Sequence, residues 1–357
     1  MDPALLIPTP DTIPAPWGWF QFFLILTFFV HLIFMNAMIG SAAITLVREL
    51  RTPPHDPSAC RDLANKLPYT IAFAVNFGVA PLLFLQVLYG HFIYTSSILM
   101  GAYWLSIIAI IIPAYYGAYI YKMGEGRLIA YRKPALAVSL VLMMLIGFLF
   151  VNNMTLMQRP AAWLQYFNQP NGTILNLDDP TLIIRYLHFM VASVAGGGLF
   201  LAILAFFQQR KGIIGAEARI KSGLKWFTYA TVVEVGTGIP FLFTMPKEVH
   251  QLFVGGALGH TALFSAAMLT TFFAIYYGAK EKLWPTTVAL GLTMLLMILV
   301  RDLARQAYLA PYFKPADLTV APQLSPLYLF LLFLIIGVGV VIYMLKLAAN
   351  AGKEVRP

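Results

Sequence analysis

The chain is organised as long apolar runs separated by short polar segments. Most runs are about 20 residues long or longer, which is the length that an α-helix needs to cross a bilayer. Helices satisfy their own backbone hydrogen bonds and are therefore stable in lipid. The runs predict nine helices, at about 17–46, 67–89, 103–122, 134–153, 181–207, 225–245, 250–278, 284–308 and 326–346. We expect an all-α polytopic membrane protein.

The polar segments between the runs differ in charge. Eighteen of the 24 Lys and Arg residues fall in one set of alternate loops and in the C-terminal tail, and six fall in the other set. By the positive-inside rule the richer set is cytoplasmic. We therefore expect the N-terminus outside, the C-terminus inside, and a multi-pass protein of the bacterial inner membrane.

Composition agrees with a protein embedded in the lipid bilayer. Hydrophobic residues make up 60% of the 357 residues and charged residues 11%, whereas a soluble domain carries about 25% charge. We expect residues 1–357 to form a single transmembrane domain. The net charge of +9 does not indicate nucleic acid, because the basic residues lie in short loops. The single cysteine, Cys60, lies in a predicted cytoplasmic loop, and the chain has no CxxCH sequence for covalent haem.

Several ionisable residues fall inside the predicted helices. Such residues are costly in a bilayer and usually mark function. They are His31, His188, Glu234, His260, Arg301, Asp302 and Arg305, with His91 and His250 near the outer boundary and His55 in a loop. From the rise of about 1.5 Å per residue, His188, His250 and Asp302 can share an outer layer. His31, Glu234 and His260 are predicted to form a deeper one.

Haem explains this set of residues. A neutral imidazole is a standard axial ligand of haem iron, and the anionic propionates pair with arginine. Arg185 precedes His188 by about one helical turn, and Arg301 and Arg305 share a face. Gly196 belongs to a run of small residues, 195–198, that can clear space for the ring. We expect a haem-binding core at about 17–310 and a final helix at about 326–346 outside it.

Each of these features has a second interpretation. A lone membrane histidine can simply bridge two helices, and the glycine run can serve close helix packing. Asp302 and Arg305, at positions i and i+3, can form a structural ion pair. Composition does not separate a haem protein from a haem-free proton-coupled transporter that uses Glu234 and the histidines.

Five stretches resemble subunit I of the cytochrome bd quinol oxidases. They are residues 20–22 with His31 and residues 38–40; 75–78 with Tyr89 and Gly90; 157–160; 184–188 with 191–193 and 196–200; and 302–306 with 315–319. The stretch with Arg185 and His188 is the most specific. It is similar to the helix that supplies a histidine to the low-spin haem of that family. The His31 stretch is similar to the helix whose histidine serves the oxygen-side haem. The family subunit also has nine helices in the orientation expected here.

The resemblance implies two or three b-type haems, one of which can be a modified haem, in a respiratory oxidoreductase complex with a second membrane subunit. It implies that His31, His188 and Asp302 bind iron, with Asp302 in the place of a family glutamate. The family's second ligand of the low-spin haem is a methionine, and here His250 or His260 would replace it.

Departures from the family leave the reaction open. The long outer loop that helps the family bind quinol is reduced here to residues 245–248, so the usual quinol site is in doubt. Residues 110–116 lack the acid of the family's third helix, and Glu234 can substitute for it. In one version the protein is an oxidase subunit that passes electrons from quinol or cytochrome c to oxygen, with Glu234 and Asp302 catalytic. In the other it is a relay between the quinone pool and a periplasmic cytochrome c.

Overall fold

The computed structural model describes residues 2–51, 65–123 and 130–354, so His55 and Cys60 lie outside the described residues. The described chain is helical, and its only extended pairing is one parallel bridge between Ile13 and Val320. The long helices are α1 (Trp17–Arg51), α3 (Leu67–Leu99), α4 (Gly101–Met123), α5 (Arg132–Met157), α6 (Pro180–Gln209), α7 (Ala216–Thr244), α9 (Leu258–Ala279), α10 (Leu283–Leu309) and α11 (Ser325–Glu354).

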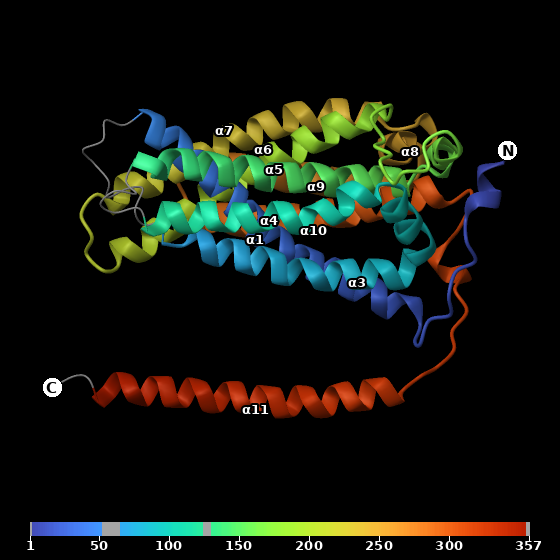
Figure 1. Ribbon diagram of the computed structural model, residues 1–357. Coiled ribbons are helices and arrows are strands. Elements are labelled where there is room, and N and C mark those ends of the chain that lie inside the picture. The colour runs from blue at the N-terminus through green and yellow to red at the C-terminus, as the bar shows by residue number, and fades with distance from the viewer. Residues whose placement is uncertain (1, 52–64, 124–129, 355–357) are drawn as a thin grey trace.

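These helices confirm the predicted all-α polytopic fold. Eight of those in the described part are long and apolar enough to cross a membrane. The exception is α7, which carries Lys221, Lys225 and Glu234 and is the least apolar of the set. The N- and C-termini lie at opposite ends of the helices (Figure 1). We refer to the end that carries the N-terminus as the outer end, following the orientation predicted from the loop charges.

The predicted helix at 250–278 is wrong at its start. A short helix α8 (Lys247–Gln251) leads into the π-helical turn η4 (Leu252–Gly256), and α9 begins only at Leu258. Gly255 has φ 102°, a value that glycine adopts without strain. The Gly255 amide then donates to the Thr261 hydroxyl oxygen at 2.9 Å, which replaces a lost helical hydrogen bond.

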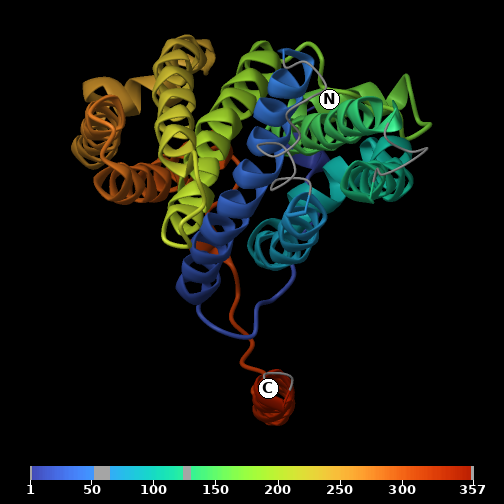
Figure 2. The same ribbon diagram turned by 90° about the vertical axis from the view of Figure 1, so that its left-hand side faces the viewer.

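The bundle has two halves that meet at α1 and α6. Seen end-on, α3, α4 and α5 lie on one side of this pair, and α7, α9 and α10 lie on the other (Figure 2). The α1 and α6 backbones touch where glycines face each other, since a Cβ atom on Gly197 would overlap the backbone of Gly40. Small residues allow this close approach in membrane helices.

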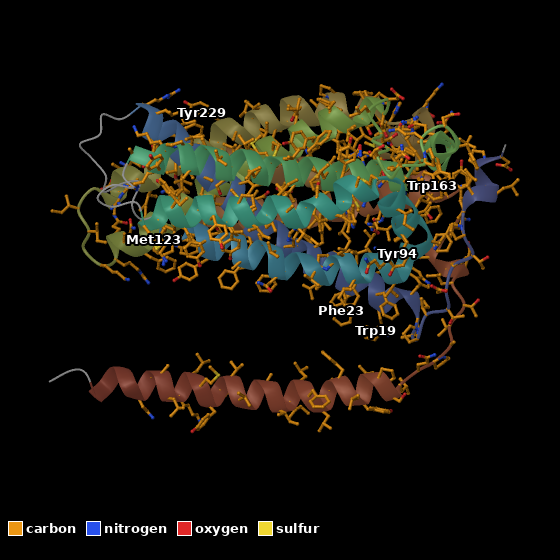
Figure 3. All side chains as sticks on the ribbon, viewed as in Figure 1. Trp19, Phe23, Tyr94, Met123, Trp163 and Tyr229 are labelled. Carbon is orange, nitrogen blue, oxygen red and sulfur yellow. The ribbon has the colours of Figure 1, made fainter. Side chains whose placement is uncertain are left out.

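The last helix, α11, stands apart from the bundle (Figures 1 and 2). Its side chains from residue 325 to 350 are all exposed, and most of them are apolar. A helix that is apolar all round is stable only in lipid or against another protein. Trp19 and Phe23, which are 62% and 38% exposed, lie on the side of the bundle that faces α11 (Figure 3). These surfaces are suited to a lipid environment.

The outer end is covered by non-membrane segments. They include three short 3-10 helices, η1 (Pro3–Leu6), η3 (Pro160–Phe167) and η5 (Pro315–Asp317). The N-terminal segment joins the segment after η5, because the Ile13 amide donates to the Thr319 carbonyl and the Ala321 amide to the Ile13 carbonyl, both at 2.9 Å. This cover packs on an apolar cluster that includes Tyr89, Phe92 and Phe313.

Candidate functional site

His31 lies between α1 and α3. Its Nδ1 atom is 3.0 Å from the carbonyl oxygen of Ala74. A carbonyl oxygen only accepts hydrogen bonds, so Nδ1 carries the hydrogen and Nε2 keeps the ring's lone pair. Gly78 lies against the imidazole, since a Cβ atom there would be 2.9 Å from the His31 Cε1 atom. Helix α3 thus fixes both the tautomer and the orientation of His31.

His188 lies between α6 and α7 in a similar arrangement. Its Nδ1 atom is 3.3 Å from the Thr237 hydroxyl oxygen, and that hydroxyl donates its own hydrogen to the Glu234 carbonyl oxygen at 2.9 Å. In this arrangement the Thr237 oxygen accepts from Nδ1, which again leaves the lone pair on Nε2. A Cβ atom on Gly238 would be 3.1 Å from the His188 Cε1 atom. This is the tautomer that binds metal through Nε2 while Nδ1–H is held by an oxygen.

At each histidine, one phenylalanine ring lies near both the imidazole and the guanidinium of an arginine. The Phe28 ring is 6.2 Å from the His31 ring, and the Arg301 guanidinium lies 4.5 Å from the centroid of Phe28. A guanidinium over an aromatic face is stabilised by the electron density of the ring. The residue that orients His31 from one side therefore also positions a cation nearby.

The same pattern occurs at His188. The Phe241 ring is 5.9 Å from the His188 ring, and the Arg185 guanidinium lies 5.3 Å from the Phe241 centroid. Arg185 is buried and donates to the Gln158 side-chain oxygen at 3.2 Å. Arg185 lies about one turn outward of His188, as the sequence predicts.

The two histidine sites lie on opposite sides of the α1–α6 contact. His31 faces α3 and His188 faces α7, whereas Asn36 and Ser193 join α1 to α6 through a hydrogen bond of 3.1 Å. A Cβ atom on Gly196 would be 2.7 Å from the Asn36 Cβ atom. The space beside Gly196 is therefore filled by protein. This is the close helix packing given as the alternative role of the glycine run, and the expected role of Gly196 beside a cofactor stays a prediction.

The structure places Glu234 beside His188, and its place in a deeper layer with His31 and His260 stays a prediction. Its Oε1 atom is 4.0 Å from the His188 Nε2 atom. His188 lies eight residues from the outer end of α6, and Glu234 lies ten residues from the outer end of α7. At about 1.5 Å per residue these depths differ by only about 3 Å, so the two predicted layers are too close to separate. The His188 and Glu234 side chains keep 17% and 24% of their surface exposed, so protein does not fill the space beside them.

Asp302 is occupied by protein donors. Its Oδ1 atom pairs with Arg305, and its Oδ2 atom accepts from the Gln21 and Gln306 side-chain amides at 2.5 and 2.8 Å. A carboxylate held by three donors is a poor iron ligand, because ligation would compete with these hydrogen bonds. The ion pair with Arg305 is the alternative role expected for Asp302, and its role as an iron ligand stays a prediction.

His250 and His260 lie on either side of the η4 turn. The His250 Nδ1 atom is 3.2 Å from the Met245 carbonyl oxygen, so it too carries the hydrogen on Nδ1. The His260 ring lies 5.3 Å from the ring of the buried Phe253. Within the described residues no hydrogen bond or ion pair joins either histidine to His188. The prediction that one of them is the second ligand stays a prediction.

Sequence reasoning missed the residues that orient the two histidines. They are Phe28, Ala74, Gly78, Thr237, Gly238 and Phe241. The sequence of α7 does contain a pattern that could have identified the residues around His188. Glu234, Thr237 and Gly238 stand at i, i+3 and i+4 and share one face of an otherwise apolar segment. An acid, a hydroxyl and a glycine on one face indicate that a polar group from another helix packs there.

Each histidine site can be compared with what a bare metal ion and what haem iron would need. In the part of the chain that the structure describes, no group of three or more His, Cys, Asp or Glu side chains could hold a metal ion. Haem iron needs only one or two axial side chains, and each site offers one oriented imidazole with a nearby arginine. No protein-family model matches this chain, and no curated protein matches it.

Proposed function

We propose that this protein is a haem-bearing electron-transfer subunit of the bacterial inner membrane, similar in kind to subunit I of the cytochrome bd oxidases. One observation carries the proposal. Two intramembrane histidines, on opposite sides of the α1–α6 contact, have the same tautomer, the same facing glycine and the same arginine–phenylalanine neighbour. Such repetition is unexpected for histidines that only bridge helices.

The residues of each site have separable tasks. His31 and His188 would hold the iron of a b-type haem through Nε2, because Nδ1 is engaged in each. Arg301 and Arg185 would pair with the haem carboxylates, and Arg185 is held for this by Gln158. A bound haem supplies a one-electron redox centre. His250 or His260 would complete the ligation at His188.

The relay version is favoured over the oxidase version. Reduction of oxygen consumes protons, which intramembrane carboxylates usually deliver. Glu234 lies beside His188 and Asp302 is held by Arg305, Gln21 and Gln306. Among the described residues neither carboxylate has an ion pair or hydrogen bond with His31. We infer electron transfer between a quinol pool and an outer cytochrome c, with a second membrane subunit covering part of the apolar surface.

A visible spectrum of the purified protein tests the proposal. We expect a reduced-minus-oxidised difference spectrum with b-type bands, and His31→Ala and His188→Ala should each remove one haem. His55→Ala, in the predicted loop, is the control and should leave the haem content unchanged. Addition of carbon monoxide should leave the reduced spectrum unchanged if both irons have two axial ligands. A wild-type protein without haem bands would refute the proposal.

A haem-free proton-coupled transporter is the second candidate. The observation that favours it is the contact between the His188 imidazole and the Glu234 carboxylate, a pair suited to proton exchange inside a membrane. If the purified protein lacks haem, proteoliposomes with an internal pH dye should acidify on addition of the transported solute. Glu234→Gln should abolish that signal.

A further inference from the structure

Three arginines lie near one another toward the outer end of the bundle, where α10 packs against α1 and α6. Arg301 and Arg305 stand about one turn apart on α10, and Arg185 lies on α6. Arg301 is close enough to both Arg305 and Arg185 to interact electrostatically with each of them. We call Arg185, Arg301 and Arg305 the arginine cluster.

Only one of the two arginines on α10 has a counter-charge. Arg305 pairs with the Asp302 carboxylate. Arg301 makes no hydrogen bond or ion pair with the described residues, and its guanidinium lies 4.5 Å from the centroid of the Phe28 ring. An aromatic ring attracts a cation but carries no net charge to balance it. Arg301 therefore keeps an unbalanced positive charge, and because it is only partly buried, a ligand can reach it.

Arg185 has no counter-charge of its own either. Its guanidinium donates to the neutral side-chain oxygen of Gln158 at 3.2 Å. Asp179 acts on Arg185 electrostatically, but that carboxylate already has an ion-pair partner in Arg159, at 3.6 Å. Guanidinium groups stay protonated in proteins, so the arginine cluster holds two positive charges without a counter-charge. Such charges are costly inside a membrane protein, which indicates that an anion binds beside them.

Buried hydrogen-bond donors in and around the arginine cluster also lack a partner. The Nε atoms of Arg185 and Arg305, residues that are only 8% and 3% exposed, have no hydrogen-bond partner among the described residues. The same holds for the hydroxyls of Tyr89, whose ring the Arg305 guanidinium covers, and of Tyr308, one turn from Arg305 on α10. One acceptor nearby, Gln21 Oε1, is unpaired as well. Buried polar atoms are nearly always paired, and water can pair with all of these. Only an anion supplies both the missing acceptors and the missing charge.

We propose that the arginine cluster is a single binding site for an anion with two carboxylate groups. The two unbalanced guanidinium groups are held by different partners, Gln158 and Phe28, so each would take its own carboxylate. Arginine suits this task because its planar fork of N–H donors matches the two oxygens of a carboxylate. The proposal rests on the proposed function only for the source of the carboxylates. In the haem protein they belong to haem, and in the haem-free transporter to a dicarboxylate from the outer medium.

Succinate, a soluble dicarboxylate, tests the site in protein that is purified without haem. Equilibrium dialysis of the full-length protein against radiolabelled succinate, at low ionic strength, should give one bound succinate per chain. Succinamate, in which an amide replaces one carboxylate, should bind at least about tenfold more weakly, because it balances only one of the two charges. This comparison uses the unmodified protein and does not depend on whether a variant folds. Equal binding of the two compounds, or two succinates per chain, would overturn the single site.

Arginine variants locate the binding site. Arg185→Gln and Arg301→Gln should each weaken succinate binding roughly tenfold or more, because each removes one of the two unbalanced charges. Arg301→Lys keeps the charge and should weaken binding less than Arg301→Gln does. Lys247→Gln is the matched control, because Lys247 is an exposed cation at the outer end that does not belong to the arginine cluster. Arginine variants that bind succinate as tightly as Lys247→Gln would overturn the proposal.

Protein that is purified with haem needs a different measurement, because haem carboxylates would occupy the site and exclude succinate. With isotope-labelled haem carboxylates, the infrared difference spectrum should show carboxylate bands that shift in Arg185→Gln and in Arg301→Gln but not in Lys247→Gln. Unshifted bands in both arginine variants would overturn the site. Succinate binding by a protein without haem bands would instead refute the proposed haem function and leave the anion site standing. A protein with neither haem nor bound succinate would refute both.

Discussion

The two histidine sites differ in the group that holds the imidazole. His31 donates to a backbone carbonyl, that of Ala74, whereas His188 donates to the hydroxyl of Thr237. No side-chain substitution can remove the carbonyl, so the tautomer of His31 is set by the backbone of α3. The tautomer of His188 depends on one side chain and can be changed by one substitution. The difference separates a fixed site from an adjustable one.

The sites also differ in their nearest carboxylate. Glu234 lies 4.0 Å from the His188 Nε2 atom. The nearest acid that the structure links to the His31 region is Asp302, and it is neutralised by Arg305. A carboxylate beside an iron stabilises the oxidised state, because that state carries one more positive charge. If the proposed haems are bound, the one at His188 should therefore have the lower potential, which would set the direction of electron flow.

The largest expected effect comes from filling the glycine positions. Gly78→Ala places a Cβ atom 2.9 Å from the His31 ring, and Gly238→Ala places one 3.1 Å from the His188 ring. Overpacking of this kind costs about 1–3 kcal/mol, so haem affinity should fall roughly tenfold or more at the substituted site only. Haem content and the two redox waves are the measurements.

Gly236→Ala is the matched control for this pair, because nothing lies within 4 Å of its Cβ position. It should leave both haems in place. If Gly78→Ala and Gly238→Ala each lowered both haems equally, the two sites would not be independent. The differences between the His31 and His188 sites could then not be assigned to each site separately.

The helices were predictable from sequence because their length and apolar character are set by the bilayer. The ends of the long helices differ from the predicted ranges by at most ten residues, but the predicted helix at 250–278 is interrupted at η4. The interruption was missed because it depends on the positive φ of Gly255, and the sequence does not show which glycine adopts a positive φ. The separation of α11 was not predictable either, since a helix that is apolar all round presents no preferred face.

The site was predictable in part. His31, His188 and Arg185 stand out as ionisable residues in apolar segments, and the structure places each between two helices. The pairing of Glu234 with His188 was missed, because a difference of about 3 Å in depth is less than one helical turn. Gln21 was missed as a partner of Asp302, because 281 residues separate them and only tertiary packing brings them together.

An effect of comparable size is expected from Thr237→Val, which removes the hydroxyl that holds His188 while keeping the shape of the side chain. Loss of such an outer partner typically lowers metal affinity 10–100-fold. The His188 haem should become easier to extract, and the His31 haem should not change. Thr231→Val on the same helix is the control, because its hydroxyl only bonds to the Phe227 carbonyl. Equal weakening by the two variants would mean that Thr237 acts through helix stability alone.

The smallest and most specific effect is expected from Glu234→Gln, which removes a negative charge 4.0 Å from the His188 Nε2 atom without changing the volume of the side chain. In the proposed haem protein the oxidised iron would lose more stabilisation than the reduced iron, so the midpoint potential of a haem at His188 should rise. With an effective dielectric constant of about 20 and screening at a side chain that keeps 24% of its surface exposed, the rise should be roughly 50–100 mV. The potential of the His31 haem should move by less than roughly 20 mV, because the α1–α6 contact separates the two sites. A redox titration followed in the visible spectrum measures both values in one sample. An equal shift of both potentials would place Glu234 between the haems, and no shift of either would mean that the carboxyl group is uncharged.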